Sequence, residues 1–432
     1  MYQPKMELTP EQLSILEGAQ GETRAKMMEC VVRYGDIFNA KRLLPLTYKT
    51  GHLVTSFGIS MLTPIYPLME ELIEAGCKAE GGFTADPRPM EFDNCSANPL
   101  EKLVFKKIIY GRQEEYEGML KKVGLLSDDS FSCTCYLPEV GNAPKEGDVI
   151  AWAESSAVVY ANSVLGAKCN RNSGVLELFM TILGVAPEFG FLTDEGRKAD
   201  YRVIIRTSKA PEAQILGSAI GMKVMEKVPY IIGLDKFLKQ LPDDDTVAYL
   251  KDMGAASASN GAVGLYHVDG ITPEAKRLGA KLIKDNAIEY VIDDAEIERV
   301  YKSYPIMWKH KDKAPQRAFI GCPHLSYKQL VDWTNKLEAG LKDTGRKKLT
   351  CYTVLTAAPA VVKKFKATPD YARLMATGAH LASICPLMYA DNPLCGMKRL
   401  ITNSNKLRTY TFARYAKDEE LLSILVGKER IK

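Results

Sequence analysis

The spacing of apolar residues predicts helices at the start of the chain. Thr9 is a candidate N-cap, Pro10 suits the first helical position, and Gln12 completes a capping box before an apolar run. A second helix is predicted over residues 23–39. From about residue 45 to residue 200 the chain is richer in Gly, Pro, Asn and Ser, which is typical of mixed structure with long loops.

From about Tyr201 onward, short β-branched or aromatic runs alternate with amphipathic helical stretches. The predicted strands are YRVIIRT (201–207), AVGLYHV (262–268), IEYVIDD (288–294), RAFIGC (317–322), LTCYTVLTA (349–357) and LASICPL (381–387). The stretch 328–345 illustrates the helices, since it places Leu330, Trp333 and Leu337 near one face before Gly345. This rhythm is typical of βαβ units, so we expect an α/β protein with mostly parallel sheets.

No linker rich in Pro or Ser divides the chain, so we expect tightly packed domains with approximate boundaries. The expected units are an N-terminal mixed α/β domain over residues 1–200 and two α/β domains over residues 201–310 and 311–432. A chain of 432 residues has the length of two or three such units.

Composition excludes several classes of protein. With 46% hydrophobic and 25% charged residues, the chain resembles a globular protein rather than a disordered one. Its 57 basic and 53 acidic residues form no like-charge run typical of a nucleic-acid partner.

No apolar run reaches the roughly 18–20 residues of a membrane span, and no secretory signal is evident, so we expect a cytoplasmic protein without a membrane partner. In that reducing compartment, its ten cysteines serve as core residues, nucleophiles or metal ligands rather than disulfides.

Polar side chains are most concentrated between Ser132 and Gly174. They are Cys133, Cys135, Asn142, Glu154, Ser155, Ser156, Asn162, Ser163, Asn170, Arg171 and Asn172. Such a concentration indicates the lining of a cleft. The alternative is that the Ser, Asn and Gly residues only satisfy the hydrogen bonds of turns and caps.

Two Cys-Pro pairs follow predicted strands. Cys322, with His324 two residues further on, follows one strand, and Cys385 follows another. Ligands gather beyond the carboxyl ends of parallel strands, and Pro restricts the residue before it, so both thiols are candidate metal ligands. The alternative is that both cysteines are small hydrophobic residues of the core.

A polar segment near the C-terminus, RLITNSNKLRTY (399–410), is a candidate anion site. If a helix starts here, Ser404 or Asn405 caps it, and its amides form an anion site with Lys406 and Arg408. The alternative is a solvated helix start with two basic residues.

A second segment, residues 253–268, resembles a glycine-rich phosphate loop only loosely, because it lacks the GxGxxG and GxxxxGK patterns. We expect a close-packed turn that carries Ser257, Ser259 and Asn260 toward the cleft.

Several motifs taken together resemble one family. They are GNAPKEGDVIAWAESSAVVYANSVLGAKCNRNSG (141–174), IGCPHLS (320–326), ICPLMY (384–389) and TNSNKLRTY (402–410). With these motifs the chain is similar to the large subunit of the aconitase X family, from about Leu8 to about Tyr410. The resemblance implies an aconitase-like assembly of packed α/β domains that acts as a hydro-lyase, or dehydratase.

The resemblance also implies an iron–sulfur cluster or iron, held by Cys133, Cys322 and Cys385. Three well-separated thiolates suit iron better than a structural zinc, whose ligands usually pair at short spacing. Iron with an open coordination site acts as a Lewis acid on a leaving hydroxyl. A cubane with one open iron, a two-iron cluster and a single iron all remain open.

Candidate roles follow from the same motifs. The candidate catalytic residues are Glu154, Ser155 and His324, with Glu154 and His324 as proton carriers or as supports of the residues that bind. The candidate substrate contacts are His52, Ser156, Asn170, Arg171 and Lys406, of which Lys406 suits a carboxylate or phosphate.

The resemblance implies a partner and a class of substrate. The family enzyme needs a small swivelling domain, expected here as a separate subunit that carries the catalytic base. The implied reaction removes water from a small β-hydroxy carboxylate, with cis-3-hydroxy-L-proline as the leading substrate and mevalonate 5-phosphate as the alternative. An aconitase-type isomerase and a non-catalytic iron-sensing or RNA-binding relative are further alternatives.

Two departures from the family pattern affect these expectations. Cys135 stands where the family usually has Pro, so it competes with Cys133 as a ligand. The segment 51–60 matches the family's His-containing block only at His52 and Ser56, which leaves room for a different substrate.

Overall fold

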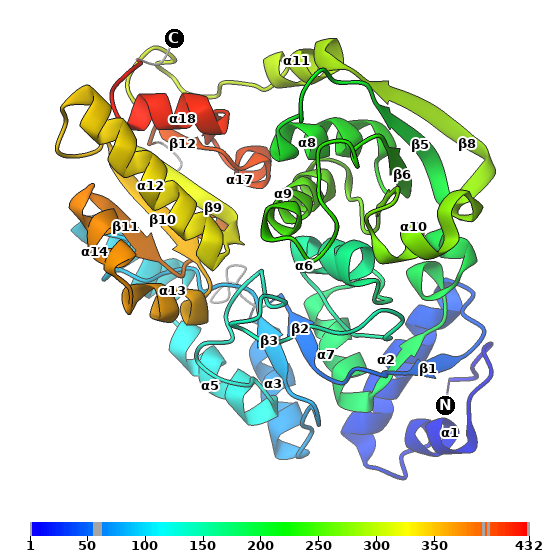
Figure 1. Cartoon of the computed structure of the whole chain (residues 1–432). Coiled ribbons are helices and arrows are strands. Elements are labelled where there is room, and N and C mark those ends of the chain that lie inside the picture. The colour runs from blue at the N-terminus through cyan, green and yellow to red at the C-terminus, as the bar shows by residue number, and fades with distance from the viewer. Residues whose placement is uncertain (1, 55–62, 391–393, 395–397, 430–432) are drawn as a thin grey trace.

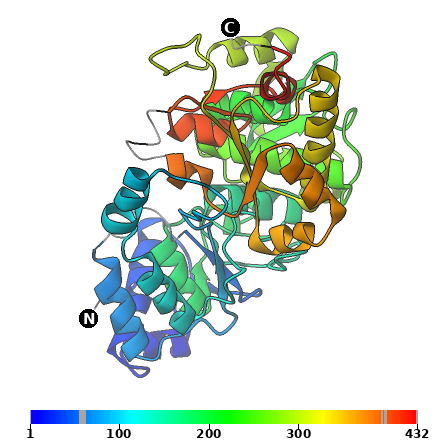
Figure 2. The same ribbon diagram turned by 90° about the vertical axis from the view of Figure 1, so that its left-hand side faces the viewer.

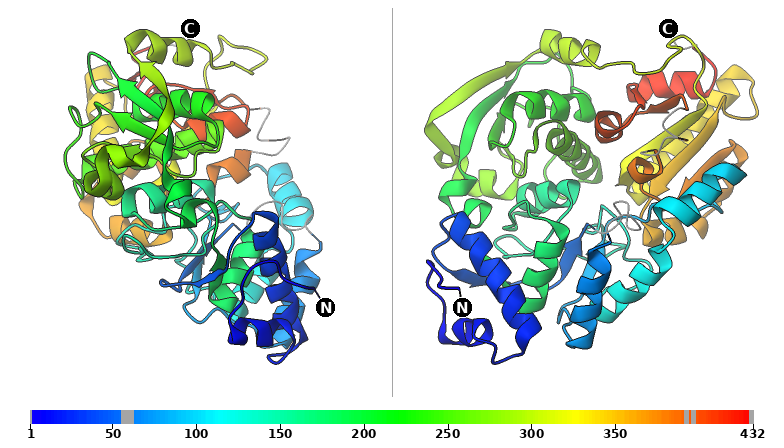
Figure 3. Two further views of the ribbon diagram at one scale, coloured as in Figure 1. Left: turned by 90° about the vertical axis from the view of Figure 1, so that its right-hand side faces the viewer. Right: turned by 180° about the vertical axis from the view of Figure 1, so that it is seen from behind.

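The computed structural model describes residues 2–54, 63–390, 394 and 398–429 of the chain. Figure 1 shows three lobes, formed in turn by the N-terminal part (blue to cyan), the middle part (green) and the C-terminal part (yellow to red). Seen from the sides and from behind, the N-terminal lobe lies beneath the other two (Figures 2 and 3). Within the described ranges, no helix is both long and apolar enough to cross a membrane.

The N-terminal lobe consists of helices and long loops around two small sheets. Its elements are α1 (Pro10–Leu16), α2 (Glu22–Ile37), β1 (Leu43–Pro45), β2 (Gly51–Leu53), α3 (Ile65–Glu74), β3 (Phe83–Ala85), α4 (Pro99–Val104), α5 (Gln113–Val123), α6 (Ser155–Tyr160), α7 (Gly174–Leu183) and β4 (Val185–Pro187). β1 pairs antiparallel with β4, and β2 pairs parallel with β3. The predicted capping box is confirmed, because the Thr9 side chain accepts from Gln12 N while the Gln12 side chain accepts from Thr9 N.

The middle lobe contains a four-stranded parallel sheet in the order β7-β6-β5-β8. Its elements are β5 (Ala199–Ile205), α8 (Ala213–Val224), β6 (Pro229–Ile232), α9 (Asp244–Gly261), β7 (His267–Val268), α10 (Pro273–Leu278), β8 (Ile283–Ile292) and α11 (Asp294–Lys302). α8 and α9 pack side by side, and α9 faces α6 of the N-terminal lobe (Figure 1).

The C-terminal lobe contains a five-stranded parallel sheet in the order β11-β10-β9-β12-β13. Its elements are β9 (Arg317–Leu325), α12 (Tyr327–Thr344), β10 (Tyr352–Ala357), α13 (Pro359–Lys366), α14 (Pro369–Ala376), β11 (Ala379–Ala382), α15 (Pro386–Ala390), β12 (Leu400–Thr402), α17 (Asn405–Tyr410), β13 (Arg414–Tyr415) and α18 (Asp418–Leu425). The predicted helix 328–345 is confirmed, and Gly345 ends it at a φ of 66°. The predicted α/β class with mostly parallel sheets is confirmed as well.

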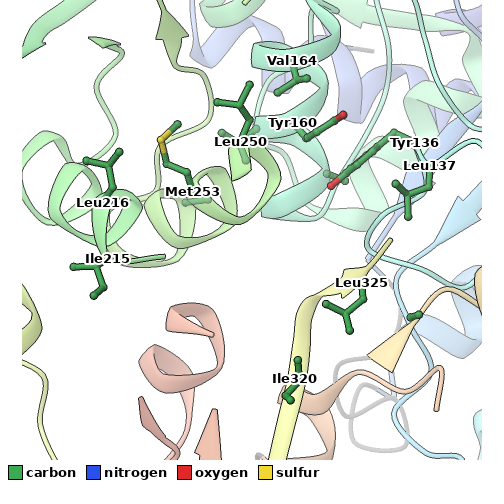
Figure 4. Packing of buried hydrophobic residues seen from close by; sticks show 14 of the residues in the cluster. Tyr136, Leu137, Tyr160, Val164, Ile215, Leu216, Leu250, Met253, Ile320 and Leu325 are labelled. Atoms are coloured by element: carbon green, nitrogen blue, oxygen red, sulfur yellow. The ribbon is translucent and has the colours of Figure 1, made fainter. Parts of the chain in front are cut away.

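The largest apolar core extends through all three lobes. It joins Tyr136 and Tyr160 of the N-terminal lobe, Ile215 and Leu250 of the middle lobe, and Leu325 of β9 (Figure 4). The rings of Tyr136 and Tyr160 stack with their centroids 3.6 Å apart. Because the lobes share this core, they pack as neighbours without a linker, and the domain boundaries near residues 200 and 310 stay predictions.

Two sequence predictions for the middle lobe are wrong in detail. The strand predicted over residues 262–268 forms only at His267–Val268, because Ala262 ends α9 in the left-handed conformation with a φ of 62°. The second difference is strand β6, which is not among the predicted strands. A buried apolar run of four residues has no alternation that separates a strand from part of a helix.

The turn predicted over residues 253–268 is also wrong, since residues up to Gly261 belong to α9. The close packing expected there exists as a helix crossing, because a Cβ on Gly261 would overlap the carbonyl oxygen of Gly221 in α8. Three side chains predicted to reach a cleft instead donate to carbonyls of their own helix, at 2.9–3.1 Å: Ser257, Ser259 and Asn260.

Gly261→Ala is expected to destabilise the protein, because the added Cβ forces α9 away from α8. Overpacking of this kind costs about 1–3 kcal/mol, so the midpoint of urea denaturation should fall. Gly118→Ala in α5 is the matched control, since a Cβ on Gly118 meets nothing within 4 Å. The control should be neutral or stabilising by up to about 1 kcal/mol, because Ala is the better helix former. Equal midpoints for Gly261→Ala and the wild type would contradict the close crossing.

Candidate active site

A small cavity lies where the N-terminal and C-terminal lobes meet, and its volume is about 40 Å³. Its lining residues are Asp86, Pro87, Cys133, Glu154, Gly321, Cys322, Pro323, His324, Cys385, Pro386, Leu387 and Lys406. The cavity therefore brings together the three predicted cysteine ligands with three other predicted site residues, Glu154, His324 and Lys406.

Cys133 reaches the cavity from a loop that runs beside β3. Ala85 of β3 forms an isolated bridge with Phe131, and the Ser132 N–H donates to the Ala85 carbonyl at 2.7 Å. This pairing places Cys133 just beyond the carboxyl end of β3. Cys135 is fully buried in the largest apolar core and does not line the cavity.

Cys322 and Cys385 come from the two strands that flank β10. Cys322 lies in β9, and the Ser404 hydroxyl donates to its carbonyl oxygen. Cys385 follows β11, and its N–H donates to the Arg88 carbonyl at 2.7 Å. Because β9 and β11 are both parallel to β10, the two thiols emerge at the same edge of the sheet.

His324 lies between the three cysteine segments and is fully buried. Its Nδ1 is 3.1 Å from Ser132 Oγ, and its Nε2 is 3.1 Å from the carbonyl oxygen of Ile384. Its backbone N–H donates to the Cys133 Sγ at 3.4 Å. Burial lowers the pKa of the imidazole to about 4, so the ring is neutral at pH 7.

Glu154 caps the N-terminus of α6, and its Oε2 accepts from Ala157 N at 2.7 Å. Its φ of 82° lies in the left-handed region, which a residue with a side chain adopts only when its surroundings hold it there. One holding contact is upstream, where the Ala153 N–H donates to the His52 carbonyl at 2.7 Å. The backbone thus turns the Glu154 carboxylate into the cavity.

Lys406, in the first turn of α17, forms a buried ion pair with Glu154. The side chains of Lys406 and Glu154 are only 14% and 8% exposed. The Lys406 Nζ also lies 2.8 Å from Ser156 Oγ and 3.3 Å from Ser155 Oγ. The ammonium therefore contacts three side-chain oxygens from one helix start, those of Glu154, Ser155 and Ser156.

Electrostatics keep this ion pair charged. Burial alone would raise the pKa of the Glu154 carboxyl, but the ammonium of Lys406 lowers it below its usual value. Burial alone would lower the pKa of Lys406, but the Glu154 carboxylate raises it. Both groups are therefore ionised at neutral pH.

The three cysteines are desolvated. Burial raises the pKa of the Cys133 thiol to about 12, and it raises those of Cys322 and Cys385 as well. Without a cation among them, these thiols stay protonated at pH 7. A metal would have to displace three protons to bind here, as metals do at thiolate sites.

The other predicted site residues lie outside the cavity lining. His52 is fully buried behind Glu154, with its Nδ1 2.8 Å from Thr84 Oγ1. Its Nε2 has no hydrogen-bond partner among the residues that the structure describes. Burial lowers the pKa of His52 to about 4, so it is neutral. Ser56 lies outside the described residues.

Asn170 and Arg171 hold loops in place at the junction of the N-terminal and middle lobes. Asn170 Nδ2 donates to the Phe189 carbonyl at 3.0 Å, and its Oδ1 accepts from Phe191 N at 2.8 Å. Arg171 donates to the carbonyl oxygen of Ala262. Neither residue lines the three-cysteine cavity.

The predicted helix start near the C-terminus is confirmed, with Ser404 as the cap: its Oγ accepts from Leu407 N at 3.1 Å. Arg408 does not point to the same place as Lys406, because its Nη2 donates to Asn260 Oδ1 at 2.5 Å. Of Lys406 and Arg408, only Lys406 lines the cavity.

Asp86 is a cavity residue that the sequence analysis missed. It is 4% exposed, and its N–H donates to the Leu53 carbonyl at 2.9 Å. It directly follows β3 and therefore lies at the carboxyl end of a strand, the kind of position that made Cys322 a candidate. The sequence does not predict this position, because β3 has three residues, too few to show the alternation of a strand.

A larger cavity of about 280 Å³ also borders Cys322 and Pro323 of β9. Four acidic side chains contribute to its lining: Glu212, Asp245, Asp252 and Asp418. Of the three candidate ligands, only Cys322 borders it. The smaller cavity is therefore the candidate active site, because all three candidate ligands line it.

Comparisons with known proteins agree with this arrangement. The family model described as "Aconitase X first domain" matches residues 5–195, and "Aconitase X second domain" matches residues 180–302. The chain belongs to the aconitase X family. The resemblance carried by the sequence motifs is thereby confirmed.

Relatives within the aconitase X family are named dehydratases. The chain is 32% identical over 337 residues to the phosphomevalonate dehydratase large subunit of Thermococcus kodakarensis, covering 76% of each chain. It is 31% identical over 292 residues to the cis-3-hydroxy-L-proline dehydratase of Pseudomonas aeruginosa, covering 65% of this chain and 47% of that protein. The aconitase X of Thermococcus kodakaraensis, solved in its holo-form, matches 97% of this chain and 100% of its own with a TM-score of 0.80 and 29% identity.

Lys406→Met is expected to destabilise the protein at pH 7 by about 3–5 kcal/mol, because it leaves the Glu154 carboxylate buried without its partner. In the wild type the pKa of Glu154 is lower in the folded than in the unfolded state. The contribution of this carboxylate to the free energy of unfolding is therefore present above its pKa in the unfolded state, and it is lost as the pH falls through its pKa in the folded state. In the variant, burial raises that pKa, so the deficit should shrink as the pH falls.

Urea denaturation at pH 7 and pH 5 measures this difference. The double variant Lys406→Met/Glu154→Gln is the control, since it removes both charges and should recover part of the lost stability. A deficit that is the same at both pH values would show that the charge of Glu154 does not cause it.

Proposed function

We propose that this chain is the large subunit of a hydro-lyase that removes water from a small β-hydroxy carboxylate. The observation that carries the proposal is the cavity in which three cysteines face the Glu154–Lys406 ion pair, in a chain of the aconitase X family. The named activities of its relatives, on cis-3-hydroxy-L-proline and on phosphomevalonate, both concern a carboxylate with a β-hydroxyl group. We take cis-3-hydroxy-L-proline as the leading substrate and mevalonate 5-phosphate as the alternative.

Cys133, Cys322 and Cys385 are the proposed ligands of an iron–sulfur cluster or of iron. The donor set fits, because three buried thiols face one cavity. Lys406 favours the thiolate forms of Cys133 and Cys322, and the His324 N–H favours that of Cys133.

The residues around the cavity have separable tasks in this proposal. When bound, the iron supplies a Lewis acid that polarises the leaving hydroxyl. Lys406, held protonated, orients the substrate carboxylate, and Ser155 and Ser156 direct its ammonium. Glu154 is the proposed proton carrier of this chain, because it is ionised and turned into the cavity. Asn170, Arg171 and His52 remain candidate contacts for parts of the substrate outside the cavity.

A separate small subunit is the proposed partner, since the relative from Thermococcus is itself named a large subunit. We expect that subunit to supply the base that removes the proton next to the carboxylate. The cytoplasmic location stays a prediction from the sequence.

The proposed activity is tested by purifying the chain anaerobically with its small partner and measuring iron, acid-labile sulfide and turnover. We expect iron and sulfide, with loss of water from cis-3-hydroxy-L-proline or mevalonate 5-phosphate. Conversion of the dehydrated product into a different hydroxy acid would indicate an isomerase instead. Salt-dependent RNA retention with no lyase activity would overturn the enzyme assignment.

The ligand assignment is tested by a matched pair of variants. Cys133→Ala should lose the iron absorbance and reduce turnover to background, whereas Cys135→Ala should keep both, since Cys135 faces the core. Cys322→Ser should behave like Cys133→Ala. Cys351→Ser is a control outside the cavity. Intact iron and turnover in Cys322→Ser, or loss of iron only in Cys135→Ala, would contradict the assignment.

A further inference from the structure

His324 connects the three cysteine segments through one ring. Its Nδ1 contacts Ser132, the residue before Cys133, and its Nε2 contacts Ile384, the residue before Cys385. The ring itself belongs to the residue two positions after Cys322. Segments separated by 192 and 60 residues along the chain therefore meet at a single imidazole.

The hydrogen bonds determine which ring nitrogen carries the proton. The Ile384 carbonyl oxygen only accepts, so Nε2 must be the N–H donor. Nδ1 and Ser132 Oγ form the second hydrogen bond of the ring, at 3.1 Å. The Ser132 oxygen also accepts from the Thr134 N–H at 3.0 Å. Both ring nitrogens are therefore used in holding loops together.

The backbone of His324 is fixed as firmly as its ring. Its carbonyl oxygen accepts from the Lys251 Nζ at 2.8 Å, and Lys251 is 2% exposed. Its N–H donates to the Cys133 Sγ. His324 is thus fixed at two ring atoms and two backbone atoms, and neither ring nitrogen is free to carry a proton to or from a substrate.

We propose that His324 is a positioning residue that sets the spacing of the three cysteine thiols, and that it is not a proton carrier. The inference rests on the proposed function, in which these thiols hold the iron–sulfur cluster or iron. Partners of this kind typically change metal affinity or activity by about 10–100-fold when they are removed.

The test compares two substitutions of His324 in the chain purified with its small partner. His324→Gln keeps an N–H donor within reach of the Ile384 carbonyl, whereas His324→Phe keeps a flat ring but removes both ring nitrogens and their hydrogen bonds to Ile384 and Ser132. We expect His324→Phe to release iron to a chelator about 10–100-fold faster than the wild type. His324→Gln should retain its iron and most of its turnover, and the pH profile of kcat should keep its shape.

His267→Phe is the matched control. His267 is also buried, and its Nε2 lies 2.8 Å from a carbonyl oxygen, that of Arg197, but it does not line the three-cysteine cavity. Its substitution should lower stability without changing the rate of iron release from folded protein. If His324→Phe does not fold, Ser132→Ala is the second variant, because it removes only the hydrogen bond at Nδ1. It should accelerate iron release less than His324→Phe would.

Three outcomes would overturn the inference while leaving the proposed function intact. They are unchanged iron release in both His324→Phe and Ser132→Ala, equally fast release in His267→Phe, and a His324→Gln variant that keeps its iron but loses turnover together with one limb of its pH profile. A wild-type complex that holds no iron would instead overturn the proposed function.

Discussion

The ion pair between Lys406 and Glu154 is the contact on which the arrangement of the cavity depends. It joins a helix start in the N-terminal lobe to one in the C-terminal lobe, 252 residues later. Two charges removed from water are costly unless they meet in good geometry with further hydrogen bonds. Ser155, Ser156 and the Ala157 N–H supply those bonds, so the pair links the two lobes at the cavity.

The cavity residues are placed mainly by short backbone pairings rather than by long elements. Ser132 pairs with Ala85, Ala153 pairs with His52, and Cys385 pairs with Arg88. The C-terminal sheet supplies a rigid edge at which β9 and β11 end together. Loops fixed at a few points beside a rigid sheet are a common way to gather reactive groups from distant parts of a chain.

The titratable side chains around the cavity differ in whether they carry a charge at neutral pH. Glu154 and Lys406 are held ionised by each other, whereas burial keeps His52 and His324 neutral. The neutral histidines suit tasks that need fixed hydrogen bonds, and the ionised pair suits tasks that need a charge. The environment of each group, more than its residue type, separates the positioning groups from those that meet a substrate.

Sequence alone determined the features that depend on neighbours along the chain. The capping box at Thr9, the cap at Ser404 and the end of a helix at Gly345 are local hydrogen bonds or backbone preferences, so they were predicted correctly. The alternation of strands and helices that is typical of a parallel α/β protein could also be recognised, as could the family motifs, because both are patterns of neighbouring residues along the chain.

Only the tertiary structure decided which polar residues meet. It turned Cys133 toward the cavity and Cys135 into the core, paired Lys406 with Glu154, and placed Asp86 beside them. It also replaced the predicted turn before residue 262 with the helix crossing of α8 and α9. These outcomes depend on contacts between segments tens to hundreds of residues apart, and spacing within a single segment carries no information about such contacts.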